Sequence, residues 1–102
     1  MKQQISKSST IVAAKDQVSC DLAGEAVILN LKSGVYYGLN PVGARVWSLI
    51  QEPRTVGAVL EALLEEYEVD PGRCEGDLLL LLDELIGRDL LEIKTETNGA
   101  GK

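Results

Sequence analysis

The 102-residue sequence contains no histidine and only two cysteines, Cys20 and Cys74. Histidine is the commonest general base and the commonest ligand of transition metals, so the usual forms of both chemistries are excluded. Neither cysteine lies in a C-x-x-C pair, and no phosphate loop of the form G-x-x-x-x-G-K-[ST] occurs. We therefore expect a protein that is not an enzyme and holds no metal or other cofactor. Both cysteines are expected to be small buried side chains, with a redox pair as the alternative.

Long hydrophobic runs are also absent. The longest apolar run is five leucines at positions 78–82, far short of the roughly 20 residues that cross a membrane. The N-terminal sequence MKQQISKSST has no apolar stretch like that of a secretory signal. We therefore expect a cytoplasmic protein that does not enter the membrane.

Basic charge is scarce and dispersed. The formal net charge is −6, and the ten Lys and Arg residues are spread from Lys2 to Lys102. Proteins that bind nucleic acid concentrate basic charge where the phosphates lie. The sequence therefore favours a neutral or basic polypeptide, rather than nucleic acid, as the partner.

The composition, with 45% hydrophobic and 25% charged residues, is typical of one small globular domain. Residues 1–8 and 95–102 are polar, lack periodicity and are expected to be flexible tails. Residues 9–94 are expected to form a single domain.

Short β-like runs fill residues 9–39, namely TIVAA, QVSCDL, EAVILNL and VYYGLN. The break at Ala23–Gly24–Glu25 predicts a hairpin. Lys32–Ser33–Gly34 predicts a second tight turn, in which Gly34 is free to take a positive φ. These features predict a small antiparallel meander at the front of the chain.

Three helices are predicted after residue 39. Asn40 and Asp70 are each followed by proline, which is the pattern of an N-cap with proline at the first helical position, and Thr55 is a third cap. Glu52–Pro53 is expected to end the first helix. The predicted buried faces of the first two helices are Val42, Val46, Leu49 and Ile50, then Val56, Val59, Leu60, Leu63, Leu64 and Tyr67. Trp47 is assigned to the core.

At the end of the third helix, Gly87 is expected to be left-handed, with Arg88 complementing the helix dipole. Leu90, Leu91 and Ile93 form either a short strand or an irregular tail. The order of elements predicts an α+β domain, like a winged helix-turn-helix, with an N-terminal three-stranded antiparallel sheet followed by three helices.

The third helix, CEGDLLLLLDELI, has more apolar surface than a small core needs. At about 100° per residue, its apolar arc spans roughly 160°, whereas a surface helix usually buries about 100°. The arc contains Cys74, Leu78, Leu81 and Leu85, continued by Leu79, Leu82 and Ile86, with Leu80 outside it. Two interpretations remain open: the surplus contacts a second partner, or all these leucines except Leu80 belong to the core.

The stretch GVYYGLNPVGARVWSLI, with aromatic residues in a strand, then Leu-Asn, Gly and a Trp-bearing helix, resembles the PqqD-like family. TVGAVLEALLEEYEVDP and the closing DLLEI resemble the rest of that domain, so the resemblance covers about residues 18–93. A free-standing chain of this length is similar to the RiPP recognition element of lasso-peptide biosynthesis.

The resemblance implies a peptide-binding protein. Family members bind the leader segment of a ribosomally synthesised precursor peptide, which adds as an antiparallel strand to the third strand of the sheet beside the third helix. Carried onto this sequence, the edge strand is Val35, Tyr36, Tyr37, Gly38 and Leu39. The groove wall is Cys74, Asp77, Leu78, Leu81, Leu82 and Leu85.

Some of these assignments keep alternatives. Strand side chains alternate, so either Tyr36 or Tyr37 faces the groove, although each tyrosine could instead anchor sheet to helix. Asp77 either pairs with a basic leader residue or faces water.

The resemblance also implies partners and a ligand pattern. The leader would carry a Tyr-x-x-Pro pattern, and the enzymes served would be a leader peptidase of the cysteine-protease type and an ATP-dependent macrolactam synthetase. Two other functions compete with this one. A winged-helix DNA-binding regulator is disfavoured because Arg73 is followed by Glu75 and Asp77. A homo-oligomerising adaptor would bury the leucines against a second copy.

Overall fold

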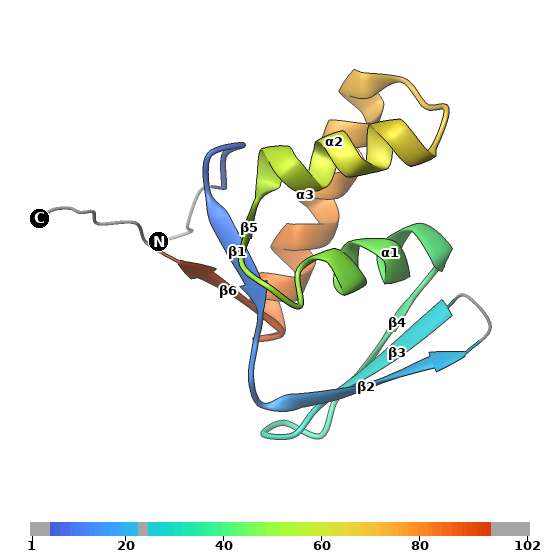
Figure 1. The fold of residues 1–102 in the computed structure, drawn as a ribbon. Helices are drawn as coiled ribbons and strands as arrows, with labels where there is room; N and C mark the ends of the chain where they lie inside the picture. The colour runs from blue at the N-terminus through green and yellow to red at the C-terminus, as the bar shows by residue number, and fades with distance from the viewer. Residues whose placement is uncertain (1–4, 23–24, 95–102) are drawn as a thin grey trace, which may run out of the picture.

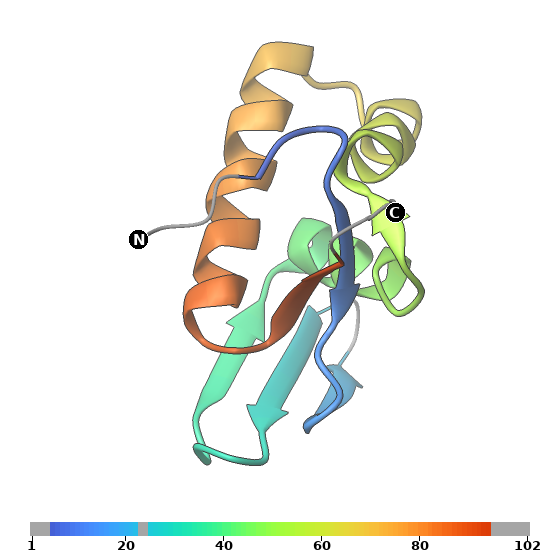
Figure 2. The ribbon, with the colours of Figure 1, turned by 90° about the vertical axis from the view of Figure 1, so that its left-hand side faces the viewer.

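The computed structural model describes residues 5–22 and 25–94, which form two three-stranded antiparallel sheets and three helices (Figures 1 and 2). The chain therefore has the α+β class that the sequence predicts. In chain order the elements are β1 (Thr10–Ala13), β2 (Gln17–Leu22), β3 (Glu25–Asn30), β4 (Tyr36–Leu39), α1 (Pro41–Leu49), β5 (Arg54–Thr55), α2 (Val56–Glu66), α3 (Pro71–Gly87) and β6 (Leu91–Lys94).

The first sheet is the predicted meander, with strand order β2-β3-β4. Its β3–β4 turn contains Gly34 at φ +75°, as predicted. The predicted break at Ala23–Gly24 lies outside the described residues, but the flanking strands pair antiparallel up to Leu22 and Glu25. Because β3 is central, β2 and β4 are the edges of this sheet.

The second sheet has the order β5-β1-β6 and is absent from the sequence prediction. The TIVAA run leaves the meander, because β1 pairs antiparallel with β5 on one side and β6 on the other. Leu91–Lys94 forms a strand, which settles the alternative left open for the end of the domain. The strand β1 thus holds together segments from the start, middle and end of the described chain.

The helix starts agree with the predicted caps. The Asn40 side chain accepts a hydrogen bond from the Gly43 N–H at 2.8 Å. Thr55 and Asp70 accept from the third residue after each, at 3.1 Å and 3.0 Å. These contacts satisfy amides that have no partner within the helix.

The helix ends differ from the prediction. α1 ends at Leu49, before Glu52–Pro53, with Ile50 as its C-cap. Gly87 is the last residue of α3, and the left-handed residue after it is Asp89, at φ 59°. An aspartate tolerates this conformation better than most residues, so the chain turns into β6 without glycine.

A single core joins both sheets to all three helices. Trp47 lies in it, as predicted, with 4% of its surface exposed. Not every residue predicted to be buried lies in this core, because Leu64, Tyr67 and Cys74 are partly buried and pack against it, and Val42 and Cys20 are exposed. Val42 is 43% exposed because the first turn of α1 lies at the edge of the core. Cys20 is exposed because it lies on the edge strand β2, and Cys74 is half-buried.

Residues 5–8 contact the domain, since the Lys7 carbonyl accepts from the Gly57 N–H at 2.9 Å. Residues 1–4 and 95–102 of the expected tails lie outside the described ranges. Within those ranges, no helix combines the length and apolarity that crossing a bilayer requires.

The buried polar side chain of Asn30 joins the meander to α3. Its Oδ1 accepts from the Lys32 N–H at 2.8 Å and the Ser33 N–H at 3.2 Å, and its Nδ2 donates to the Arg88 carbonyl at 2.9 Å. One side chain therefore shapes the β3–β4 turn and fixes the C-terminal end of α3 beside it.

We expect Asn30→Ala to lower the free energy of unfolding by about 2–3 kcal/mol, because three hydrogen bonds are lost and partly buried partners are left unpaired. Urea denaturation measures this change. The control is Ser33→Ala in the same turn, whose exposed hydroxyl accepts only from the Val35 N–H, and it should change stability by less than about 0.5 kcal/mol. Equal effects of the two variants would contradict the assigned role of Asn30.

Candidate functional site

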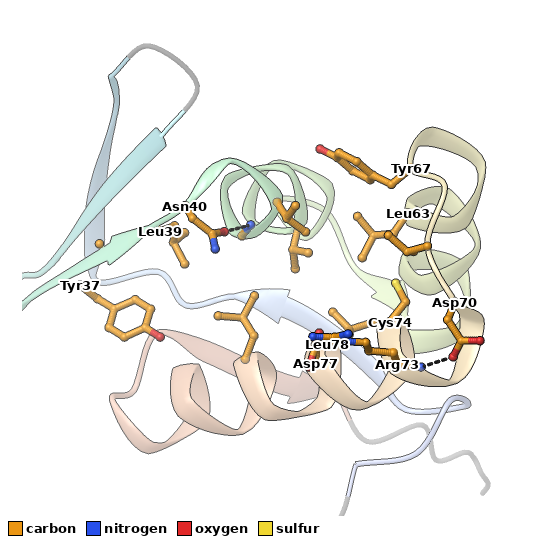
Figure 3. A pocket seen from close by; sticks show the side chains of 16 residues that line it. Tyr37, Leu39, Asn40, Leu63, Tyr67, Asp70, Arg73, Cys74, Asp77 and Leu78 are labelled. Carbon is orange, nitrogen blue, oxygen red and sulfur yellow. Dashed lines mark hydrogen bonds between the residues drawn. The ribbon is translucent and has the colours of Figure 1, made fainter.

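A groove of about 640 Å³ opens between β4, α1, the end of α2 and the first half of α3 (Figure 3). Its lining is mostly apolar, with charged groups only at the α3 side. The lining residues are Tyr37, Gly38, Leu39, Asn40, Val42, Gly43, Val46, Leu63, Tyr67, Val69, Asp70, Arg73, Cys74, Asp77, Leu78 and Leu81. We call this set of residues the groove.

The strand β4 contributes an open main-chain edge to the groove. The Asn30 N–H donates to the Val35 carbonyl at 3.0 Å, and β3 pairs Ile28 with Tyr37. In an antiparallel ladder, alternate residues direct their N–H and C=O groups to opposite sides. Tyr37 and Leu39 therefore bond to β3, while the main-chain groups of Tyr36 and Gly38 point away from the sheet. Among the described residues, no strand pairs with that side of β4.

The alternation also decides which tyrosine faces the groove. Tyr37 lies on the same face of the sheet as the buried Ile28 and lines the groove, whereas Tyr36 is on the opposite face and is 68% exposed. Val35 precedes β4 and is 45% exposed, and neither Val35 nor Tyr36 lines the groove. Tyr37 is thus the side chain through which β4 reaches α3.

Tyr37 contacts two charged residues near the end of α3. Its hydroxyl donates a hydrogen bond to the Glu84 carboxylate, and the Arg88 guanidinium lies 4.9 Å from the centroid of its ring. Burial and the neighbouring Glu84 carboxylate raise the pKa of Tyr37 above its usual value, and the Arg88 cation opposes them. These contacts anchor β4 to α3 and bound the groove at this end.

The apolar arc of α3 divides between the groove and the core. Cys74, Asp77, Leu78 and Leu81 line the groove, as the assignment from the family placed them. Leu82 and Leu85, assigned to the same wall, have no exposed surface and lie in the core instead. They cannot touch a ligand in this structure, because the helix turns their side chains toward the two sheets and the other helices. Leu80, outside the arc, is 69% exposed.

Several groove residues were missed from the sequence. Leu63 and Tyr67 come from α2 and its C-cap (Figure 3). Val42 and Val46 come from α1, and Val69 comes from the loop before α3. Val42 could have been predicted, because side chains in the first turn of a helix point toward the helix N-terminus, and β4 lies directly before α1. The other positions depend on how α1 and α2 pack, which no local pattern encodes.

The charged groups of the groove lie at the start of α3. Asp70 is occupied as the N-cap, accepting from the Arg73 N–H, whereas Asp77 extends from an exposed position one turn beyond Arg73. Burial, together with the Asp77 charge, raises the pKa of the Cys74 thiol, which disfavours the reactive thiolate. Within the described ranges, no group of three or more His, Cys, Asp or Glu residues could hold a metal ion. The arrangement therefore suits binding of an apolar chain.

The fold and the site define a small α+β domain with an open edge strand beside an apolar groove. Residues 25–91 match the family described as coenzyme PQQ synthesis protein D (PqqD), and the chain belongs to this family. No curated protein matches the sequence.

Two solved structures have similar folds. The structure of TbiB1 in complex with the TbiA(beta) leader peptide is 35% identical, with a TM-score of 0.76 over 83% of this chain and 99% of that one. A lasso peptide synthetase B1 complexed with its leader peptide is 22% identical, with a TM-score of 0.71 over 80% of this chain and 96% of that one. The second likeness supports the fold alone.

We expect Glu84→Gln to lower the pKa of Tyr37, because it removes the carboxylate that disfavours the phenolate. The measurement is the ultraviolet absorbance of tyrosinate during an alkaline titration, with Tyr37→Phe identifying the Tyr37 component. Asp83→Asn is the matched control, since Asp83 is the adjacent exposed carboxylate on α3. A Tyr37 titration that is the same in the wild type and in Glu84→Gln would show that the contact is not populated.

Proposed function

We propose that this chain binds the leader segment of a ribosomally synthesised precursor peptide, which adds as a strand along β4 and places alternate side chains in the groove. The observation that carries the proposal is the unpaired main-chain edge of Tyr36 and Gly38, which lies directly beside an apolar groove. Main-chain hydrogen bonds supply affinity in this mode of binding, and the groove supplies specificity. The 35% identical TbiB1, solved with a leader peptide, supports the same assignment.

The peptide-facing residues of the proposal are a subset of those expected from the sequence. Tyr36 and Gly38 supply main-chain groups, and Val35 lies at the end of the same edge. Side chains that can touch the ligand are Tyr37, Leu39, Cys74, Asp77, Leu78 and Leu81. Because Asp77 is exposed at the rim, we include in the proposal that it pairs with a basic residue of the leader.

In this proposal the protein is a binding partner and not a catalyst. It holds the leader while the remainder of the precursor stays free for a leader peptidase of the cysteine-protease type and a macrolactam synthetase. The family resemblance supports both partners. Genes for a short precursor, such a peptidase and such a synthetase beside the gene for this chain would support the pathway, and their absence would argue against it.

Leu81→Asp is expected to weaken leader binding about tenfold or more, because it places an unpaired charge where apolar side chains of the ligand would pack. Leu81 is half-buried and lines the groove, so the variant keeps the fully buried leucines of α3. Leu80→Asp is the matched control, since Leu80 is the adjacent residue and points away to solvent. Fluorescence anisotropy with the labelled leader of the neighbouring precursor gives both affinities. Equal affinities in folded variants would eliminate the groove as the site.

Gly38→Pro tests the edge strand separately from the groove. Proline removes the outward N–H of residue 38, so binding should weaken about tenfold from the loss of one main-chain hydrogen bond and the bulk of the ring. Gly38→Ala keeps the N–H, and a Cβ at this position meets no atom within 4 Å, so it should bind like the wild type. The same anisotropy titration applies. If Gly38→Pro keeps full affinity, the leader does not add to β4.

A further inference from the structure

The strand β2 is a second open edge, at the opposite side of the meander from the groove. It lies at the margin of the molecule, where no helix covers it (Figure 1). Val18, Ser19, Cys20 and Asp21 are all exposed, and Val18 exposes 52% of its surface. The described part of β2 contains no lysine, proline or bulge, and Asp21 is its one charged side chain, whereas edge strands that avoid pairing usually carry several such devices.

The hydrogen-bond pattern identifies which main-chain groups of β2 are free. The Leu31 N–H donates to the Asp16 carbonyl at 3.0 Å, which makes Gln17 and Asn30 a non-hydrogen-bonded pair. Val18 and Cys20 therefore bond to β3, while Gln17, Ser19 and Asp21 direct their main-chain groups outward. The Gln17 N–H is already used, since it donates to the Lys15 carbonyl at 3.0 Å. Within residues 5–22 and 25–94, nothing pairs with the outward donor and acceptor of Ser19 or with those of Asp21.

We infer that two copies of this chain associate by antiparallel pairing of β2 with β2 about a two-fold axis at Cys20. This register bonds Ser19 of one copy to Asp21 of the other, and the reverse, so each of the four free groups per strand finds a partner. A shift that centres on Asp21 would set two like charges directly opposite each other. A shift that centres on Ser19 would pair Asp21 with Gln17, whose N–H is occupied.

The pairing joins the two meanders into one continuous sheet and covers the exposed side of Val18. Both β4 edges remain free at the outer ends of that sheet, so each copy keeps its groove. The inference is therefore independent of the proposed function, and the two can fail separately.

The Cys20 thiols provide a reporter of the register. In this arrangement the two Cys20 residues form a non-hydrogen-bonded pair, with Cα atoms about 4.5 Å apart, which is within the range that a disulfide spans. Diamide accepts the two electrons and two protons that two thiols lose when they form a disulfide. Cys74, half-buried in the groove, is remote from the proposed axis and should not form this link.

The experiment combines sedimentation equilibrium with diamide treatment of the reduced full chain. The wild type should change from 11.0 kDa towards twice that mass as concentration rises, and diamide should trap a covalent dimer. Cys74→Ser should still be trapped, and Cys20→Ser should not. A wild type that stays monomeric over the whole concentration range and is not trapped by diamide would overturn the inference.

Ser19→Pro and Ser19→Ala form a matched pair for the strand itself. Proline removes the outward N–H of residue 19 but no bond to β3, so the dissociation constant of the dimer should rise about tenfold or more, and Ser19→Ala should associate like the wild type. Circular dichroism and leader binding verify the fold of Ser19→Pro. If Ser19→Pro does not fold, the Cys20 and Cys74 variants still decide, because a dimer trapped through Cys74, or one that diamide cannot trap through Cys20, rejects this register.

Discussion

The side chain of Asn30 is the contact on which the geometry of the groove depends. It hydrogen-bonds to the β3–β4 turn and to the carbonyl of Arg88, the C-cap of α3, and these bonds fix the position of β4 relative to the helix. Tyr37 adds a second connection further along, through Glu84 and Arg88. Because both connections lie toward the C-terminal end of α3, the strand and helix are held together there. Toward the start of α3 the space between them is left open, and that space is the groove (Figure 3).

The helix α3 serves two surfaces with one apolar arc. Leu82 and Leu85 are fully buried, while Leu81 and Cys74, on the adjacent side, line the groove. A helix whose apolar arc matched the core alone would leave nothing for a ligand. The excess width thus gives the proposed site an apolar wall on α3 while Leu82 and Leu85 remain in the core.

The sequence predicts those features of the fold that depend on residues close together in the chain. Asn40, Thr55 and Asp70 are caps because their side chains reach amides only three residues away, and Gly34 takes the positive φ of its turn. The second sheet is not predictable in this way, because β5 has only two residues and is a strand only through its pairing with β1. The groove is predictable from the sequence only in part. The family resemblance identifies β4 and α3, but the division of the arc between Leu81 and Leu82 depends on tertiary packing.

The strand β1 pairs Thr10 directly with Lys94 on β6, and neither strand contributes to the lining of the groove. Before β1 the chain stays on the domain, since the Lys7 carbonyl accepts from the Gly57 N–H at the start of α2. In this architecture the two ends of the described chain and the proposed binding groove occupy separate parts of the domain.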